Sequence, residues 1–560
     1  MIKEILESMV AQAIEAARAA GALVTEEVPP IDIDAPAKKE FGDYSSNLAM
    51  LLAKSERKAP LIIAECIKEH MSARADVIDE IRVEKPGFLN FYLKTDYLAS
   101  GLGAVMSAAD EYGKSDLGAG SKVLLEFVSA NPTGPLHVGH GRGAAVGDAL
   151  GRILSATGHD VHREYYVNDA GNQMEMLGAS TLIRYRQSKG EDVEFPDNLY
   201  SGEYIKEIAE SKPYQEALAG KEGVDATQAS IAFTSKLILE TIKGDLESFR
   251  VGFDEWFSEK SLFAGGDPTE LTGKVGEAIQ ALESAGHIFE DKGAKWLKSS
   301  AHGDEKDRVV VREDGRPTYL ASDIAYHHLK FNRGFDQCIN IWGADHHGYL
   351  PRVRASLEML EHDPERLKVL FVQFVSLRRG GEPVQMSTRA GQFEELSKVV
   401  EEVGVDAARF FFMLRSPDSA LEFDLDLAME QSSENPVFYV QYAHARTCSL
   451  FHQATERGIT FNTEGGITPG GLSLPEEHVL AKTLLEWPEI VEVAARRLEP
   501  HRISFYLLSL AKDFHAYYNR HRVLEQAPEV TMARLYLIRC MQIVLKNGLA
   551  LLGVSAPDKM

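Results

Sequence analysis

The chain has 560 residues, of which 44% are hydrophobic and 26% charged, the composition of an ordinary globular protein with room for about three or four domains. No run approaches the roughly 18 apolar residues that a membrane span needs, so we expect no membrane association. The formal net charge of −24 argues against a uniformly basic nucleic-acid-binding surface, because phosphate contacts need Lys and Arg.

The cysteines stand far apart and form no C-x-x-C pair. Neither a disulfide framework nor a zinc ribbon is therefore expected, and we predict no tightly bound, protein-ligated metal. A reducing, cytoplasmic location fits this cysteine usage best.

The first 110 residues are predicted to form a small α+β domain. Residues 1–22 carry apolar side chains at helical spacing, with Gly21 placed to end the helix, which indicates a folded amphipathic helix rather than a signal peptide. In residues 81–93, two apolar runs flank Pro86-Gly87, the pattern of a β-hairpin.

Residues 111–400 alternate short β-rich runs with helical stretches. This alternation predicts a Rossmann-type α/β domain, in which crossover helices join parallel strands. The runs expected to be strands of its sheet are 122–130, 308–312 and 337–343. The mostly helical stretch at about 180–300 is expected to be an insertion or an elaborated crossover.

Residues 401–560 have helical periodicity almost throughout, which predicts an all-helical C-terminal domain. Within it, residues 496–522 combine basic and aromatic side chains, a mixture that could stack RNA bases. Taken alone, this stretch is better explained by a solvated helix whose aromatic side chains face inward.

The segment "NPTGPLHVGHGRG" (131–143) lies between a predicted strand and a predicted amphipathic helix. Free N–H groups and the helix dipole attract phosphate at such a junction. His137 and His140 could donate to the oxygens of an α-phosphate during an in-line displacement, and Gly139 and Gly141 leave room for a planar base. An ordinary turn with surface histidines is the alternative, but the H-x-G-H pattern favours a nucleotide site.

Two acidic residues stand where a cationic ligand could use their charge. Glu126 interrupts the apolar run "VLLEFV", where an unpaired charge would be costly. Asp323 follows Tyr319 by four residues, so one helical turn could present both side chains to one ligand. The alternatives are an ion pair with a neighbouring Lys or Arg for Glu126 and a helix cap for Asp323.

The segment "NIWGADHHGYLPR" (340–352) runs from an apolar strand into a polar cluster. Asp345, His346 and His347 could suggest a metal site. Neighbouring side chains on a strand point to opposite faces, however, and no third ligand is evident. A metal site is therefore not favoured at this edge.

"HVGH" (137–140) resembles the HIGH signature of class I aminoacyl-tRNA synthetases, and "EFVSANPTGPLHVGHGR" (126–142) resembles the arginyl-tRNA synthetases closely. The likeness covers most of the chain and includes "FGDYSSNLAM" (41–50), "VDAARFFFMLRS" (405–416) and "LLGVSAPDKM" (551–560). In order and at suitable spacing, these matches identify the chain as a member of that family.

The resemblance implies three domains: a tRNA-elbow-contacting domain in 1–110, the catalytic domain in 111–400 and an anticodon-binding domain in 401–560. It implies that L-arginine reacts with ATP and Mg2+ to give arginyl-adenylate and pyrophosphate, and that arginine then passes to the terminal adenosine of tRNA(Arg). It also implies that activation requires bound tRNA and that the enzyme is a monomer.

Carried over residue by residue, the resemblance assigns the catalytic roles to His137, His140 and Arg389. The implied ATP contacts are Pro135, Leu136, Val138, Gly139, Gly343, Asp345, Met386 and Ser387. The implied arginine contacts are Glu126, Ser129, Asn131, His140, Tyr319, Asp323 and His347. Many relatives carry glutamines where His346 and His347 stand, so the roles of these two are not fixed.

The second class I signature, KMSKS, is expected where "VQMSTRAG" (384–391) stands. Met386 and Ser387 match, whereas Gln385 and Thr388 replace the lysines. A loop cation suits neutralising the departing pyrophosphate, and arginine can do so with its fork geometry. The candidates for this cation are Arg378, Arg379 and Arg389.

Two alternatives differ from this interpretation. The first is another H-x-G-H nucleotidyltransferase. Such an enzyme would need no tRNA platform, so the long N-terminal and C-terminal domains argue against it. The second is a non-catalytic tRNA-binding paralogue. The absence of the signature lysines favours it, whereas four intact site residues argue against it: His137, His140, Glu126 and Asp323.

Overall fold

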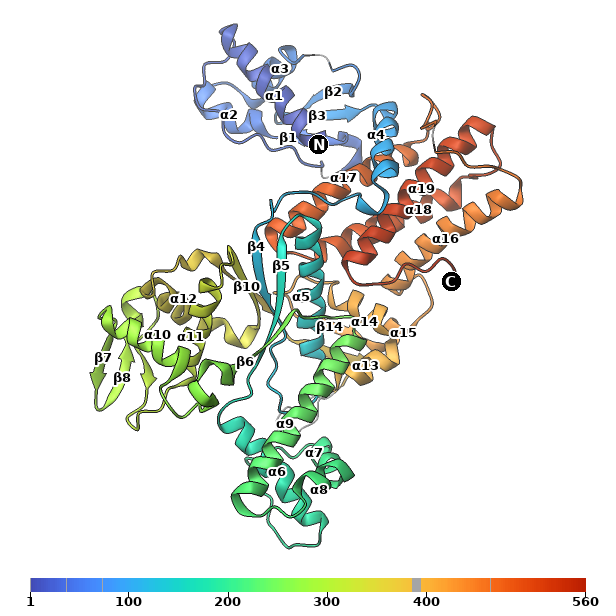
Figure 1. Ribbon diagram of the computed structural model, residues 1–560. Helices are drawn as coiled ribbons and strands as arrows, with labels where there is room; N and C mark the ends of the chain where they lie inside the picture. The colour runs from blue at the N-terminus through green and yellow to red at the C-terminus, as the bar shows by residue number, and fades with distance from the viewer. Residues whose placement is uncertain (1, 37, 73, 385–393, 464) are drawn as a thin grey trace. The chain divides into compact units, whose positions relative to one another are not determined.

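The computed structural model describes residues 2–36, 38–72, 74–384, 394–463 and 465–560. The chain forms two compact units (Figure 1). The first unit comprises residues 1–112, 446–489 and 512–544, and the second comprises 113–445, 490–511 and 545–560.

The first unit contains a three-stranded antiparallel sheet in the order β1-β3-β2. Its strands are β1 (Tyr44–Ser46), β2 (Ile78–Glu84) and β3 (Phe88–Leu93). The helices that accompany them are α1 (Ile2–Ala19), α2 (Leu48–Glu56), α3 (Pro60–Glu69) and α4 (Thr95–Ala108). The predicted hairpin is confirmed by the pairing of β2 with β3. The predicted first helix is confirmed as α1, with Gly21 at a positive φ of 70° behind it.

The second unit is built on a parallel sheet in the order β11-β10-β4-β5-β6. The strands are β4 (Lys122–Glu126), β5 (Asp160–Val167), β6 (Glu255–Ser258), β10 (Gln337–Gly343) and β11 (Leu367–Val372). The chain runs outward from β4 to β6 and then returns to the other side of β4 with β10. Open α/β sheets bind ligands at such a reversal, beyond the carboxyl ends of the strands. The prediction of a Rossmann-type fold is confirmed.

Two of the three predicted strands belong to this sheet, as β4 and β10. The third, predicted at 308–312, is a strand, but the prediction that it joins the parallel sheet is wrong. It forms β9 (Arg308–Val311) in a separate antiparallel sheet, where it pairs with β8 (Ala294–Leu297). Strand β8 in turn pairs with β7 (Ile288–Asp291). A short valine-rich run predicts a strand, but it does not reveal which sheet the strand joins.

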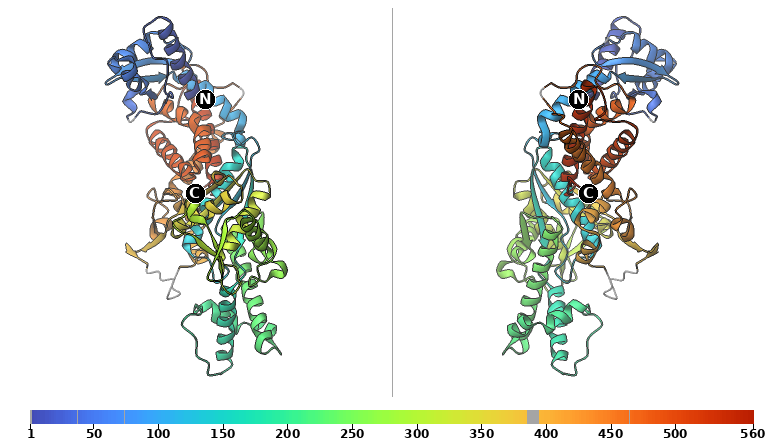
Figure 2. Two further views of the ribbon diagram at one scale, coloured as in Figure 1. Left: turned by 90° about the vertical axis from the view of Figure 1, so that its left-hand side faces the viewer. Right: turned by 90° about the vertical axis from the view of Figure 1, so that its right-hand side faces the viewer.

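The stretch expected to be a helical insertion also contains an edge strand of the parallel sheet, β6. Before it, four helices form an arm that extends beyond the sheet in both views of Figure 2. They are α6 (Asn172–Ser188), α7 (Glu203–Glu210), α8 (Lys212–Leu218) and α9 (Gly223–Ser248).

The second unit also contains helices outside this arm. They are α5 (Val138–Ala156), α10 (Gly273–Ser284), α11 (Tyr319–Asn332), α12 (Leu350–Met359), α13 (Leu396–Val403), α14 (Val405–Phe412) and α15 (Leu425–Met429). A small sheet joins β12 (Val375–Arg379) to β13 (Glu382–Pro383) and to β14 (Leu421–Asp424), the last in parallel.

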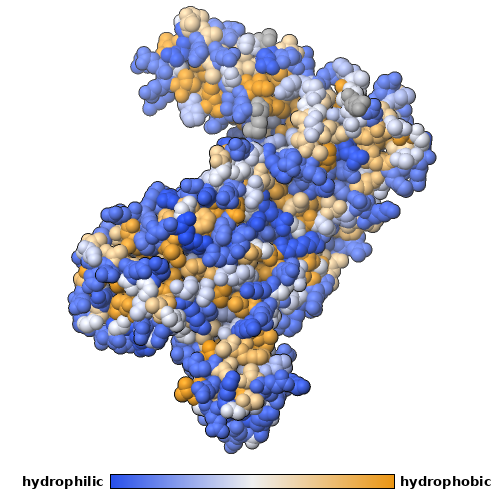
Figure 3. All heavy atoms as spheres, in the orientation of Figure 1, coloured by the Kyte–Doolittle hydropathy of each residue, from blue (hydrophilic) through white to orange (hydrophobic). Residues whose placement is uncertain are grey.

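Four long helices follow, and their residues are divided between the two units. They are α16 (Pro436–Glu456), α17 (Pro475–Arg497), α18 (His501–Arg520) and α19 (Pro528–Leu551). Tyr506, Phe514 and Tyr517 of α18 are buried, which confirms the explanation of this stretch by inward-facing aromatic side chains. No helix in the described part of the chain is long and apolar enough to span a bilayer, and polar side chains cover most of the face in Figure 3.

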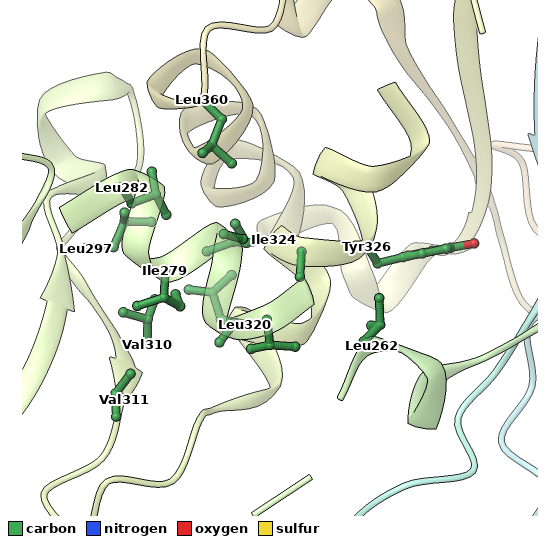
Figure 4. Close-up of a cluster of buried hydrophobic side chains, with 14 of the residues drawn as sticks. Leu262, Ile279, Leu282, Leu297, Val310, Val311, Leu320, Ile324, Tyr326 and Leu360 are labelled. Atoms are coloured by element: carbon green, nitrogen blue, oxygen red, sulfur yellow. The ribbon is translucent and has the colours of Figure 1, made fainter. Parts of the chain in front are cut away.

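An apolar cluster fixes helix α11 in the second unit (Figure 4). Leu320 and Ile324 pack with residues of α10 and of the antiparallel sheet, including Ile279, Leu282, Leu297 and Val310. Tyr326 extends to the other side of the helix, where its hydroxyl donates to Glu164 on β5 at 2.6 Å. One face of α11 is thus held by apolar packing, which leaves a polar face toward the parallel sheet.

Candidate active site

The strand β4 ends in a strained turn. Val128 and Ser129 have positive φ angles of 66° and 42°, a region that a β-branched residue rarely occupies. Such strain is concentrated at functional sites, where the surrounding structure maintains it. The turn lies at the reversal of the sheet and leads directly into the 131–143 segment.

His137 and His140 cap the first turn of α5 reciprocally. Nδ1 of His137 accepts from the backbone N–H of Gly139 (3.1 Å) and of His140 (3.4 Å), while Nδ1 of His140 accepts from the N–H of His137 (3.3 Å). Their rings stack at 3.7 Å between centroids. Because both Nδ1 atoms accept, each neutral ring carries its proton on Nε2. The pair therefore presents Nε2–H donors.

Both imidazoles are neutral at physiological pH. Burial lowers the pKa of His137, and burial together with the neighbouring His137 lowers the pKa of His140 to about 3. Gly139 permits the stacked arrangement, since a Cβ there would lie 2.9 Å from Cε1 of His137. The helix start can therefore receive a phosphate through neutral donors and the helix dipole rather than through an imidazolium.

The loop before α5 is held by the helical arm. Tyr204 of α7 donates its hydroxyl to the carbonyl of Thr133 at 2.6 Å. A Cβ on Gly134 would lie 3.0 Å from that hydroxyl, so the loop passes close to the ring. The segment predicted as an insertion thus supports the loop that precedes the histidines.

The backbone that follows the second signature motif is hydrogen-bonded to the backbone of the first signature motif. The N–H of Leu396 donates to the carbonyl of Leu136 at 2.7 Å, and the N–H of Val138 donates to the carbonyl of Glu394 at 3.3 Å. Met386, Ser387 and Arg389, with Gln385 and Thr388, lie outside the described residues. The described chain nevertheless brings the segment that follows "VQMSTRAG" next to "LHV".

The other candidate loop cations have acidic partners. Arg378 contacts Glu422 at 2.9 Å, and Arg379 contacts Glu402 at 2.6 Å. All four side chains are at least partly exposed, so a phosphate could compete for either guanidinium at modest cost.

Glu126 is buried at the end of β4. Its Oε2 pairs with Nζ of Lys330 and its Oε1 accepts from the hydroxyl of Ser129 at 2.9 Å. Burial acts to raise the pKa of Glu126, but the Lys330 ammonium outweighs it and the pKa lies below its usual value. The ion pair weighed as the alternative for Glu126 is therefore present, and the residue is also directly beside the strained turn.

Asp323 lies inside α11, so the helix-cap alternative is wrong. The hydroxyl of Tyr349 donates to its carboxylate. Burial raises the pKa of Asp323 to about 6, and the nearby Glu126 adds to this. Tyr319, the first residue of α11, is 52% exposed, and Asn131 is half-buried in the loop after the turn.

The polar cluster after β10 is exposed. Gly343, Asp345 and His347 stand at the carboxyl end of β10, and the His347 ring stacks on Phe371 of β11 at 4.3 Å. Asp345 contacts His346 at 3.6 Å. The described residues place no third metal-ligating side chain with this pair.

Glu259 was missed by the sequence reasoning. It follows β6 at the carboxyl edge of the sheet, is buried, and its Oε2 has no hydrogen-bond partner among the described groups. Burial, with the nearby carboxylate of Asp323, raises its pKa to about 7. Because β6 was not predicted, nothing marked Glu259 as the residue after a strand.

Lys330 was also missed, although a signal for it exists. Asp323, Tyr326, His327 and Lys330 recur at spacings of three and four residues, which places polar groups on one face of a helix that is otherwise apolar. Such a stripe on a buried helix predicts a polar network against the neighbouring layer.

Comparisons with known proteins match this arrangement along the whole chain. The descriptions "Arginyl tRNA synthetase N terminal domain", "tRNA synthetases class I (R), catalytic domain" and "DALR anticodon binding domain" match residues 4–93, 102–432 and 440–560. An arginine–tRNA ligase of Geobacter sp. (strain M21) is 49% identical over the full length of both chains. The chain belongs to the arginyl-tRNA synthetase family.

Other members agree with this assignment. An arginine–tRNA ligase of Bacillus licheniformis is 44% identical over all of the chain and 99% of its own length. The arginyl-tRNA synthetase structure from Thermus thermophilus superposes with a TM-score of 0.73 at 25% identity and full coverage of both chains. The catalytic-domain match extends to residue 432 of this synthetase and so includes α14 and β14.

Proposed function

We propose that this class I synthetase activates L-arginine with Mg-ATP and then charges tRNA(Arg) at its terminal adenosine. The observation that carries the proposal is the junction at the start of α5. There, the stacked His137–His140 pair adjoins the chain that follows the second signature, at the reversal of the sheet.

Activation is an in-line displacement at the α-phosphorus. A carboxylate oxygen of arginine forms the new bond to phosphorus, the bond to the bridging oxygen breaks, and pyrophosphate leaves with that electron pair. The Nε2–H groups of His137 and His140 donate to the α-phosphate oxygens as charge builds on them. Catalysis is therefore positioning and charge stabilisation, with no protein nucleophile.

The nucleotide lies along the start of α5 and the end of β10 in this proposal. Pro135, Leu136, Val138 and Gly139 border it on one side, and Gly343 and Asp345 approach its ribose on the other. Arg389, with Met386 and Ser387, accompanies the pyrophosphate, and Arg378 and Arg379 are the described cations nearest in sequence to that stretch.

Arginine recognition uses the carboxylates of the second unit. A guanidinium offers planar donors that match carboxylate acceptors. Asp323, oriented by Tyr349, and Glu259, whose Oε2 has no hydrogen-bond partner among the described groups, are proposed to receive it, while Glu126 receives the α-ammonium. Ser129, Asn131, Tyr319 and His347 complete the surroundings of the amino acid.

The first unit offers a pocket for an unpaired tRNA base. A cavity of about 370 Å³ is lined by Phe41, Phe88, Asn47 and Asn90 among others. Oδ1 of Asn47 is buried without a hydrogen-bond partner among the described groups. RNA-binding proteins stack unpaired bases on aromatic rings and read their edges with such amides. The acidic side chains Asp32, Asp34 and Glu84 at the same cavity disfavour a phosphate and favour the amino edge of a base.

We further propose a monomer that acts in the cytoplasm and needs tRNA for activation. The family resemblance supports the first and third points, and the four cysteines, which stand far apart in the sequence, support the second.

Arginine-dependent ATP–pyrophosphate exchange tests the proposal. The native chain should exchange only with arginine and cognate tRNA, and His140→Ala should lower kcat by about 100- to 1,000-fold, as loss of a preorganised donor does. His137→Asn retains a good N-cap residue but lacks the Nε2–H, so it should lose similar activity while keeping the native Tm.

The outcomes separate the alternatives. Exchange with a different amino acid would overturn the arginine pocket but retain the reaction. No exchange, with tRNA still retained in a filter-binding assay, would favour the non-catalytic paralogue. A protein that exchanges without tRNA and does not bind it would favour a small-molecule nucleotidyltransferase.

A further inference from the structure

A row of polar side chains crosses the parallel sheet beneath α11. Asn340, Glu126, Glu164 and Glu255 stand side by side in register on β10, β4, β5 and β6. Three neighbouring carboxylates repel one another, and burial increases that repulsion. The row therefore needs compensating cations.

Helix α11 and the residue that caps its C-terminus provide two cations, three residues apart. Arg333 contacts Glu164 at 2.6 Å and Glu255 at 2.7 Å. The ammonium of Lys330 pairs with Glu126 and donates to Oδ1 of Asn340 at 3.0 Å. The Arg333 cluster is partly exposed, whereas the Lys330 side chain is 0% exposed and that of Glu126 is 8% exposed.

A buried ion pair is an expensive way to hold a helix on a sheet. Desolvating both charges offsets most of their attraction, and well-packed apolar side chains would stabilise the fold as well or better. Stability alone therefore does not explain Lys330. Its position does suggest a role, because its partner Glu126 ends β4 two residues before the strained turn at Val128 and Ser129.

The hydrogen bonds fix the orientation of the Glu126 carboxylate but do not use all of its acceptor positions. Lys330 occupies one acceptor position on Oε2, and the Ser129 hydroxyl occupies one on Oε1. An ionised carboxylate has about four acceptor positions in all. A further cationic donor can therefore bind a carboxylate whose orientation is already set.

The titratable and charged groups facing Glu126 come from three elements. They are Lys330, His327, Asp323 and Tyr326 of α11, Glu164 and Tyr166 of β5, and Cys338 of β10. Burial raises the pKa of the tyrosines and of Cys338, so these three are neutral.

His327 is neutral as well. Its Nδ1–H donates to the carbonyl of Asp323 at 2.8 Å and its Nε2 accepts from the amide of Asn340 at 2.9 Å. Burial, with the nearby Lys330, lowers its pKa to about 4. The full positive charge at this end of the row comes from Lys330.

We propose that Lys330 is a positioning residue for amino-acid binding: its ammonium keeps the Glu126 carboxylate charged and fixed at the end of β4, where it receives the α-ammonium of arginine. This inference rests on the proposed function. In this proposal Lys330 keeps Glu126 charged for the α-ammonium, while Asp323 and Glu259 remain available for the guanidinium.

Lys330→Met tests the proposal because it removes the charge and retains most of the side-chain volume. Without the ammonium, burial raises the pKa of Glu126, so binding of the α-ammonium should require a higher pH. In the exchange assay with saturating tRNA, the KM for arginine should rise at least about tenfold near pH 6.5 and fall toward the native value near pH 8.5. The KM for ATP should stay within about twofold, since uniform loss of structure would raise both.

Arg333→Met is the matched control. It removes the other cation that faces the row, at the C-terminal cap of α11, but leaves the Lys330–Glu126 pair intact. It should leave the pH profile of the arginine KM unchanged. An unchanged profile in Lys330→Met, or an equal shift in Arg333→Met, would overturn the proposal.

The double variant Glu126→Gln/Lys330→Met decides the case if Lys330→Met does not fold. It removes both charges together, so it should fold and show a raised arginine KM without the shifted pH limb. A native arginine KM in this variant would overturn the proposal. If the native chain itself shows no arginine-dependent exchange, the proposed function fails, which is a separate result.

Discussion

At the residue scale, the carboxylates proposed to bind the guanidinium are held in a state that favours their protonated forms. Burial, with their mutual repulsion, raises the pKa of Asp323 to about 6 and that of Glu259 to about 7. Their ordinary values are 3.8 and 4.5. In the protein without arginine, the contribution of these two groups to the free energy of unfolding is therefore fully present below about pH 4. It is lost as the pH rises through 6 to 7.

Arginine should reverse this effect, because a guanidinium stabilises the charged carboxylates. We predict that the affinity for arginine increases as the pH rises from about 5.5 to 7.5, and that binding near pH 6.5 releases protons. Calorimetric titration in buffers of different ionisation enthalpy measures both effects. Asp314→Asn, an exposed turn carboxylate, should leave them unchanged. A pH-independent affinity with no proton release would contradict the prediction.

Residues that violate their local pattern were predictable from the sequence. A glutamate in an apolar strand breaks the local sequence pattern, and so do two histidines in a glycine-rich turn. Such breaks are expected at functional positions. Their partners were not predictable in this way. Lys330 lies 204 residues from Glu126 in the chain, and only the crossing of α11 over β4 brings them together.

At the element scale, the position of the histidine pair depends on how closely α5 packs against β4. A Cβ at Gly147 would lie 2.3 Å from the ring of Phe127, so glycine is required for this approach. Phe127 immediately precedes the strained Val128. The contact therefore connects the middle of the helix to the turn that leads into the site.

Gly147→Ala should destabilise the protein by about 1–3 kcal/mol through overpacking, and it should lower exchange activity by displacing the turn. Gly143→Ala is the matched control on the same helix, because a Cβ there meets nothing within 4 Å. That variant should be neutral or more stable by about 0.5–1 kcal/mol, since alanine favours helix. Denaturant unfolding measures both, and equal effects of the two variants would refute this account of the packing.

Helices were easier to predict than sheet membership for a physical reason. The apolar spacing of α1 and α5 is local, and it survives in any tertiary context. A strand such as β9 is defined by its partners, which lie elsewhere in the chain. The same limitation concealed β6, whose four residues carry little pattern of their own, and with it Glu259.

At the scale of the whole molecule, the order of parts along the chain followed from the sequence, while their division in space did not. The motifs at 41–50 and 137–140 fall within the N-terminal and catalytic-domain matches, as expected. The motif at 405–416, expected to belong to the anticodon-binding domain, falls within the catalytic-domain match instead. The sequence did not predict that the helices α16–α19 divide between two compact units. Such a division depends on long-range packing, which local periodicity does not contain.

The pocket of the first unit gives the last prediction, because it is remote in sequence from the residues proposed for catalysis. Phe88→Ala removes an aromatic ring from the cavity, and loss of one base stack should weaken tRNA binding by about tenfold. The KM values for arginine and ATP at saturating tRNA should not change, because the second unit retains its site. Ile62→Ala, on the exposed face of α3, is the control and should bind tRNA as the native chain does. Filter binding of labelled tRNA measures the difference, and native affinity in Phe88→Ala would show that this cavity holds no base.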